Sequence, residues 1–523
     1  AAPTARRWNE LSHITNTIHM FTIFHGFHLV EEYHQWKKEK RKGRNPVPVK
    51  ALKLFIAIAV PMAIWLAPSS VYGLPGINAV EHRVLAIFVF AALMWLFDTV
   101  PAWTTSLVIV VLLLFCTTNS ALWFFQSDPG GQRYDNLINN VDILHCFADP
   151  TIMLFIGGFI IAIAATKSGL DVRLAKIMLK PFGTKSENVL LGFILVTALF
   201  SMFISNTATA AMMLTFLAPV LSALPADGRG RIGLALAIPI GANIGGMGTP
   251  IGTPPNAIAL KFLNDPAGMD LGIGFGQWMM VMVPVTLVLL FVAWLILRKL
   301  FPFKQKEIHL QIKSEHMSTA KDKIVYLTFF VTILLWLTDS FTGVNANVVA
   351  MLPVGVLCMA GIITKRDLEQ LSWSILWMIA GAFALGVAMK ECGLATHLIE
   401  AVPFASWPPL AVIIGSGLLC YIMANFISHT ATAALFVPIL AIAGSTMKEQ
   451  LIPFGGVPTL LIGVAICSSV AMVLPISTPP NALADATGFI KQKYMVTTGL
   501  IMGVIGLLLG YAVLIFCGVN GIF

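Results

Sequence analysis

Charged residues are scarce in this sequence. Asp, Glu, Lys and Arg together make up 11% of the 523 residues, whereas an ordinary soluble domain contains about 25%. Hydrophobic residues make up 57%, and the mean hydropathy is +0.84. This composition excludes a water-soluble globular protein, a disordered chain and a fibrous protein. Because the apolar runs are continuous and do not alternate, helices are favoured over a barrel, and we expect an all-α polytopic membrane protein.

Cysteine pairs and a cleavable signal pattern are also missing. The seven cysteines include no CxxC pair and most lie in apolar runs, so we expect them to be small core residues. The polar N-terminus shows no short apolar core followed by a small-residue cleavage site. The net charge of +8 is explained by basic loop residues that orient the helices. We therefore expect no nucleic-acid partner and no cofactor other than a coupling ion.

Residues 1–50 differ from the rest of the chain. Apolar residues at helical spacing are followed by the basic run 37–44, which predicts an amphipathic helix on the cytoplasmic membrane surface. Five of the eleven histidines lie here, and His25 and His28 have the i, i+3 spacing of a metal site. No carboxylate or cysteine completes a recognisable ligand set, so interfacial aromatic residues are the favoured interpretation.

Eleven apolar runs after residue 50 are candidate transmembrane helices. They are 53–67, 80–97, 101–116, 152–167, 231–262, 275–298, 324–342, 345–363, 373–389, 456–485 and 494–518. Two further stretches, 187–223 and 407–445, are too long for one crossing and have Ser/Thr-rich centres, so we expect two re-entrant hairpins. The first transmembrane helix is placed within 51–80, and 301–323 is expected to be a cytoplasmic linker.

The distribution of basic residues predicts the orientation. Loops expected inside carry several Lys and Arg residues, whereas the loops 68–79 and 339–347 have none and 117–150 has only Arg133. By the positive-inside rule, eleven crossings put the N-terminus in the cytoplasm and the C-terminus outside. The protein is expected in a plasma or inner membrane.

The chain repeats itself. SNTATAAMML begins at Ser205 and SHTATAALFV at Ser428, an offset of 223; GTPPNAIAL begins at Gly252 and STPPNALAD at Ser477, an offset of 225. Gly169-Leu170 and 393–394 also match, at an offset of 224. The repeats are about 81–300 and 324–523, each with five crossings and a hairpin. Because five is odd, the copies are expected to have opposite orientations, as in secondary transporters.

The repeated motifs predict helix ends at mid-membrane. Ser205-Asn206-Thr207 has the signature of a helix N-cap, and the run 241–252 (GANIGGMGTPIG) cannot hold a regular helix. The second repeat breaks in the same way before its TPPN motif, so 231–262 and 456–485 are read as broken helices. Four half-helix N-termini with unpaired N–H groups would then form an anion site without arginine. The unwound carbonyls and the Ser and Asn oxygens suit Na⁺.

These motifs resemble those of the divalent anion/Na⁺ symporters, the dicarboxylate, citrate and sulfate carriers. The resemblance covers about residues 51–523 and includes the segment 95–101 (WLFDTVP), which is similar to the family's Trp-x-x-Glu-x-x-Pro. It implies a membrane-embedded homodimer with a scaffold domain and a transport domain that moves as an elevator. The resemblance implies substrate contacts at Asn206, Thr207, Thr253, Ser428, Thr430, Thr478 and Pro479. It implies one Na⁺ site at Ser201, Ser205, Asn206 and Gly252, and a second at Ile427, His429 and Ser477.

His429 departs from the family pattern, which has Asn at that hairpin tip. A neutral imidazole is a poor Na⁺ ligand and a protonated one repels Na⁺, so the second Na⁺ site is in doubt. His429 is read as a structural cap, a proton carrier or a fixed charge that replaces the ion.

We expect a Na⁺-coupled importer of a small divalent anion, foremost a C4-dicarboxylate such as succinate, fumarate or malate. A dicarboxylate exchanger or a proton-assisted carrier that uses His429 is the alternative. An intramembrane enzyme is disfavoured, because the adjacent Ser428 and His429 do not face each other on a helix. A channel is disfavoured by the broken repeats.

Overall fold

The computed structural model describes residues 49–68, 76–97, 99–128, 130–225, 228–265, 269–308, 319–401 and 406–522. Within these ranges the chain forms helices and isolated bridges but no β-strand, which confirms the all-α class. The predicted amphipathic segment and its histidines lie outside the described residues, apart from the start of the first helix.

The helices follow one another with short connections. The first half contains α3 (Val49–Leu66), α4 (Ala79–Phe97), α5 (Ala102–Cys116), α6 (Trp123–Gln126), α7 (Asn140–His145), α8 (Pro150–Lys167), α9 (Leu170–Leu179), α10 (Ser186–Phe203), α11 (Asn206–Ala223), α12 (Gly230–Gly245), α13 (Pro254–Leu263) and α14 (Phe275–Leu300). The second half contains α15 (Ala320–Leu337), α16 (Asp339–Thr342), α17 (Ala346–Val349), α18 (Met351–Met359), α19 (Lys365–Glu369), α20 (Trp373–Glu391), α21 (Leu394–Ala401), α22 (Pro409–Phe426), α23 (His429–Thr446), α24 (Lys448–Leu451), α25 (Gly456–Ser469), α26 (Pro479–Ala486) and α27 (Gln492–Val519).

The number of long apolar helices is lower than the eleven crossings expected. Among the described residues, eight helices are long and apolar enough to span a membrane, or nine if the bent pair Lys448–Phe454 and Gly456–Ser469 is one span. Three of the eight are the hairpin arms α10, α22 and α23. Several expected spans are short or interrupted instead: α5 has 15 residues, and α17 and α18 divide the run 345–363. Length and composition therefore support a polytopic membrane protein, and the number of crossings stays a prediction.

The two halves of the chain show the same order of elements. Helices α4, α5, α8 and α9 precede the hairpin α10–α11, the interrupted helix α12–α13 and the long helix α14; helices α15, α17–α18, α20 and α21 precede the hairpin α22–α23, the interrupted helix α25–α26 and α27. The matched glycines even share a backbone conformation. Gly169 between α8 and α9 has φ 63°, and Gly393 between α20 and α21 has φ 93°. Glycine is favoured at both turns because residues that carry a side chain rarely adopt a positive φ.

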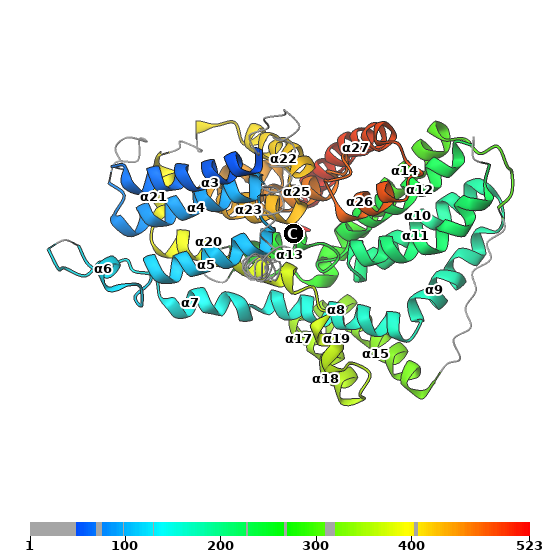
Figure 1. Cartoon of the computed structure of the whole chain (residues 1–523), viewed down its shortest axis with the longest axis horizontal. Coiled ribbons are helices and arrows are strands. Elements are labelled where there is room, and N and C mark those ends of the chain that lie inside the picture. The colour runs from blue at the N-terminus through cyan, green and yellow to red at the C-terminus, as the bar shows by residue number, and fades with distance from the viewer. Residues whose placement is uncertain are drawn as a thin grey trace, which may run out of the picture.

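Packing between the halves brings the interruptions together. Helix α13 packs against α23 and α25 of the second half, and α26 packs against α11 and α12 of the first. Figure 1 shows α3, α4, α5 and α21 toward one end of the long axis, α9, α10, α12 and α14 toward the other, and α13 near the centre. Each short half-helix is therefore held against the hairpin of the other half, and this arrangement positions the site.

Candidate functional site

The two hairpin tips are built alike. The side chain of Ser205 caps α11 by accepting a hydrogen bond from Ala208 N at 3.3 Å, and Ser428 caps α23 by accepting one from Ala431 N at 3.1 Å. Both serines have extended backbone, which turns the chain from one hairpin arm into the next. The hydroxyl pairs one of the first amides of each helix, and the others are directed at the tip.

The two helix interruptions are also alike. Thr253 precedes α13 and Thr478 precedes α26, both with extended backbone and a proline as the first helical residue. A buried asparagine holds each unwound segment: Asn256 Nδ2 donates to the carbonyls of 246 and 249 at 2.9 and 2.8 Å, and Asn481 Nδ2 donates to those of 472 and 474 at 2.9 and 3.0 Å. The carbonyls that the break removes from helical pairing are thereby partly satisfied.

The tips and interruptions meet at one cavity of about 280 Å³. Nearly all of the predicted site residues line it: Ser205, Asn206, Thr207, Gly252, Thr253, Ser428, His429, Thr430, Ser477, Thr478 and Pro479. Ser201 and Ile427 do not line it; both are buried beside it, Ser201 one turn before the first tip and Ile427 within the second. The four half-helix N-termini therefore do converge around one space.

The rest of the cavity wall comes from helices outside the hairpins. Trp103 of α5, Phe155 and Phe159 of α8, and Ile375 and Met378 of α20 supply its apolar side. Helices α5 and α20 pack closely, with Ser106 Oγ 3.3 Å from the carbonyl oxygen of 378. Sequence analysis missed these residues, because apolar side chains in apolar helices carry no local signal of a site.

The cavity has polar groups but no charged side chain among its lining residues. Backbone N–H groups and helix dipoles therefore supply the positive charge directed at this cavity, each N-terminus carrying about half a positive charge. Thr253, Thr430 and Thr478 are buried and place hydroxyl groups at these N-termini, whereas Thr207 is exposed. The arrangement can bind an anion by hydrogen bonds and dipoles without a salt bridge.

A cluster of oxygen atoms lies beside the first tip. Ser201 Oγ is 2.6 Å from Asn206 Oδ1 and 2.7 Å from the carbonyl oxygen of Ala242. Because the hydroxyl has a single proton, it donates to only one of these oxygens, and the second contact joins two acceptors. The Gly246 backbone lies against Asn206 Oδ1, and Gly252 packs against the Gly246 carbonyl, so a Cβ at either glycine would collide with its neighbour. Such a group of closely spaced, buried oxygens fits a hard cation such as Na⁺.

The equivalent atoms of the second tip are arranged differently. At the repeat offset of 223, Ala424 replaces Ser201 and His429 replaces Asn206. His429 Nε2 is 2.9 Å from the carbonyl oxygen of Ala471, so this nitrogen carries the proton and donates it. The Ser477 hydroxyl donates to the carbonyl of Asn425 at 2.8 Å. The second tip therefore lacks the two side-chain oxygens of Ser201 and Asn206, and its Ala471 and Asn425 carbonyls are both already paired. It has side-chain oxygens of its own, since Ser477 Oγ lies 3.4 Å from Asn425 Oδ1.

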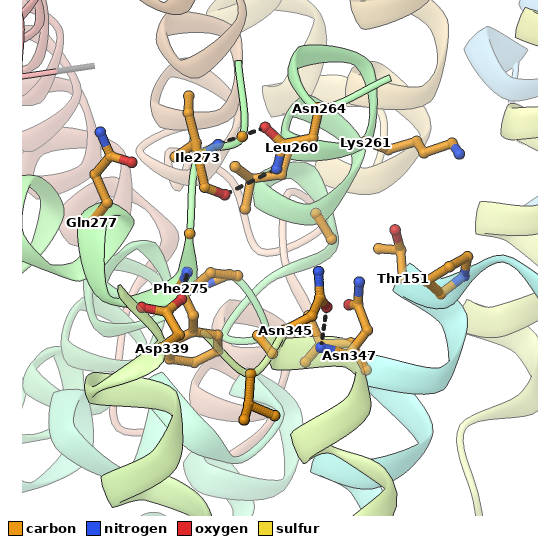
Figure 2. A pocket seen from close by; sticks show the side chains of 18 of the residues that line it. Thr151, Leu260, Lys261, Asn264, Ile273, Phe275, Gln277, Asp339, Asn345 and Asn347 are labelled. Carbon is orange, nitrogen blue, oxygen red and sulfur yellow. Dashed lines mark hydrogen bonds between the residues drawn. The ribbon is translucent and has the colours of Figure 1, made fainter. Parts of the chain in front are cut away.

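A second cavity, of about 590 Å³, lies next to the first and is drawn in Figure 2. Neighbouring residues separate the two: Leu154 and Pro250 line the second cavity, and Phe155 and Ile251 line the first. Its charged groups have partners, because Lys261 Nζ lies 2.6 Å from Asp149 Oδ2.

Backbone groups satisfy other polar residues of this second cavity. Asp339 accepts from the amide of Phe275 at 2.5 Å, at the start of α14. Figure 2 also shows Asn264 paired with both backbone groups of Ile273, at 2.8 and 2.9 Å. These contacts of Asp339 and Asn264 hold the ends of helices α13 and α14 in place.

Comparison with known proteins identifies relatives over nearly the whole chain. Residues 49–519 match the family described as the sodium:sulfate symporter transmembrane region. The chain is 28% identical over 452 residues to the sodium-dependent dicarboxylate transporter SdcS of Staphylococcus saprophyticus, covering 80% of this chain and 82% of that protein. It is 31% identical over 411 residues to the sodium-dependent high-affinity dicarboxylate transporter 3 of Caenorhabditis elegans, covering 68% and 72%.

The similarity to solved structures is weaker. The YdaH transporter of Alcanivorax borkumensis is 13% identical, with a TM-score of 0.48 over 83% of this chain and 98% of that one. The family match covers far more than half of the sequence. The chain thus belongs to the divalent anion/Na⁺ symporter family, whose members are membrane transporters and not enzymes.

Proposed function

We propose that this protein is a secondary carrier that couples Na⁺ to the import of a small divalent anion, a C4-dicarboxylate. The observation that carries the proposal is the cavity where four half-helix N-termini meet without a basic side chain, next to the oxygen cluster around Ser201. The names of the two sodium-dependent dicarboxylate transporters similar to this chain support the same substrate class.

The substrate carboxylates are proposed to bind the N-termini and their hydroxyl groups. One carboxylate contacts the first repeat and the other the second, through Asn206, Thr207, Thr253, Ser428, Thr430, Thr478 and Pro479. Each N-terminus offers free amides, and each buried threonine adds one O–H donor. Two carboxylates held by two repeats explain a preference for dianions over monoanions.

One Na⁺ is proposed to bind at the first tip, where Ser201, Ser205, Asn206 and Gly252 surround the oxygen cluster. At the second tip the set Ile427, His429 and Ser477 lacks the corresponding oxygens. The favoured assignment there is that the His429 N–H takes the place of a cation by satisfying the Ala471 carbonyl. This observation favours a second candidate function, a dicarboxylate exchanger or proton-assisted carrier with a smaller Na⁺ requirement.

The transport step is proposed to be an elevator movement of the hairpins and interrupted helices against a scaffold in a homodimer. The scaffold includes α5, α8 and α20, whose apolar side chains face the cavity. The proposed topology places 301–323 in the cytoplasm and 339–347 outside, with the termini on opposite sides of the membrane. Labelling of single cysteines in these two segments, in inside-out and right-side-out vesicles, tests the topology.

Counterflow in proteoliposomes tests the function. Vesicles loaded with unlabelled succinate are diluted into trace radiolabelled succinate, with Na⁺ or with choline at the same ionic strength. A Na⁺-coupled carrier accumulates label transiently and does so faster with Na⁺. Counterflow that is equal in Na⁺ and choline supports the exchanger, and the absence of counterflow with every dicarboxylate contradicts both candidates.

A further inference from the structure

Asn243 of α12 is a polar residue of the substrate cavity to which no role has been given so far. Its side chain is 1% exposed and lines the cavity. Asn243 Nδ2 lies 3.1 Å from Thr478 Oγ1 and 3.2 Å from Asn481 Oδ1, both in the second repeat. Asn243 therefore joins the interrupted helix of one repeat to that of the other.

The orientation of this amide is fixed by its neighbours. Asn481 Nδ2 donates to two backbone carbonyls, so Asn481 turns its Oδ1 toward Asn243. An acceptor on Asn481 requires a donor from Asn243, which assigns Nδ2 to that side. The other atom, Asn243 Oδ1, is buried and has no hydrogen-bond partner within the described residues. Buried acceptors are normally paired, and an unpaired one destabilises the protein.

A substrate donor suits this oxygen better than a cation does. A hard cation needs several oxygens, but the nearest ones are already in use. Thr478 Oγ1 accepts from Asn243 Nδ2 and from Asn481 N, and Asn481 Oδ1 accepts from Asn243. A single buried acceptor is matched by a single O–H group. Because the carboxylates of the substrate are only acceptors, the donor has to lie on its carbon skeleton.

We propose that Asn243 Oδ1 accepts a hydrogen bond from the hydroxyl group of a C4-dicarboxylate that is hydroxylated at C2. This inference rests on the proposed function and names the substrate subclass of that same site. A site built around a substrate hydroxyl rejects analogues that lack it, because its own polar group is then left unpaired. The carrier therefore prefers malate to succinate, and Asn243 sets the preference.

A ligand series on the wild-type protein tests the proposal without relying on any variant. Purified full-length protein in detergent with saturating Na⁺ is titrated with both enantiomers of malate, with succinate and with 2-fluorosuccinate, and the dissociation constants are measured by calorimetry. Fluorine replaces the hydroxyl at similar size but cannot donate. One malate enantiomer is expected to bind about tenfold more tightly than 2-fluorosuccinate or succinate. Equal binding of all these ligands overturns the inference and leaves the proposed function intact; binding of none overturns both.

The variant Asn243→Leu then assigns the preference to this side chain. It is expected to bring the malate to 2-fluorosuccinate ratio close to one. Asn256→Leu is the matched control, since Asn256 is the repeat twin of Asn481, is equally buried, and does not line the cavity. It is expected to retain the ratio, whatever its effect on the absolute affinities. A loss of the ratio in both variants, or an increased Na⁺ requirement of Asn243→Leu that is equal for all ligands, overturns the proposal.

Discussion

Removal of the Ser201 hydroxyl is the most direct perturbation of the proposed Na⁺ site. Ser201 is fully buried, and its Oγ lies 2.6 Å from Asn206 Oδ1 and 2.7 Å from the Ala242 carbonyl. Ser201→Ala removes one oxygen from this cluster and reproduces what the second repeat has at the equivalent position. We therefore expect the variant to fold and to bind Na⁺ weakly.

The size of the effect follows from the hydroxyl's role as a ligand to a charge. A hydrogen bond to a charged partner contributes about 1.5–3 kcal/mol, and we take this range for the contact between Ser201 Oγ and Na⁺. Since 1.4 kcal/mol corresponds to a factor of ten, the Na⁺ concentration for half-maximal uptake is expected to rise by about tenfold to 150-fold. The maximal rate at saturating Na⁺ should change far less.

The assay is radiolabelled succinate uptake into proteoliposomes against Na⁺, with choline as the replacement cation. Thr197→Val is the matched control: Thr197 lies one turn earlier in α10, is equally buried, and its hydroxyl bonds to the Phe193 carbonyl of the same helix at 2.6 Å. This control is expected to retain the wild-type Na⁺ dependence. If Ser201→Ala also retains it, the oxygen cluster is not a Na⁺ site and the reasoning is refuted.

Three further outcomes are expected. Thr430→Val and Thr207→Val should each raise the half-saturating succinate concentration at saturating Na⁺, more strongly for the buried Thr430, by about tenfold or more; unchanged values in both would exclude these hydroxyls from the anion site. His429→Asn should raise the Hill coefficient for Na⁺, because an amide oxygen replaces the ring N–H that donates to the Ala471 carbonyl; a Hill coefficient identical to wild type would make His429 a structural cap. Lys261→Met removes the cation beside the buried Asp149 carboxylate, which keeps only the Thr151 amide as a partner among the described residues, and should destabilise the protein by about 1–3 kcal/mol in thermal unfolding. This is less than for a fully buried pair because Lys261 is partly exposed; an unchanged melting temperature would contradict this.

The hairpin tips and interruptions could be predicted from the sequence because their residues differ from the neighbouring apolar helices in polarity or in helix propensity. Ser205-Asn206-Thr207 is polar within an apolar stretch, and Pro254 follows a run of glycines, so a continuous helix is disfavoured at both places. The repeat then showed that each feature occurs twice. Two copies of an N-cap and two of a helix restart were enough to predict one shared anion site.

Other residues of the site do not differ from their sequence neighbours in this way. Phe155 and Met378 are ordinary residues of apolar helices, and only the packing of α8 and α20 against the hairpins brings them to the cavity. Asn243 was missed for a different reason: at the repeat offset its twin is Ser468, so the comparison of the repeats gave no match. The number of crossings also escapes the sequence, because interrupted and hairpin helices have lengths that overlap with those of true spans.

The difference between the two tips separates anion binding from cation coupling. The proposed anion-binding groups are mainly backbone amides, which exist wherever the chain begins a helix at a tip or an interruption, and both repeats supply them. The cation cluster depends instead on side-chain oxygens, and exchanging Ser for Ala and Asn for His removes two of them in the second repeat without altering the hairpin. Substitutions at positions 201, 424 and 429 should therefore change how many Na⁺ ions are coupled to transport while the proposed dicarboxylate site persists. On the proposed function, the fold determines the charge of the substrate, and a few side chains determine what drives its transport.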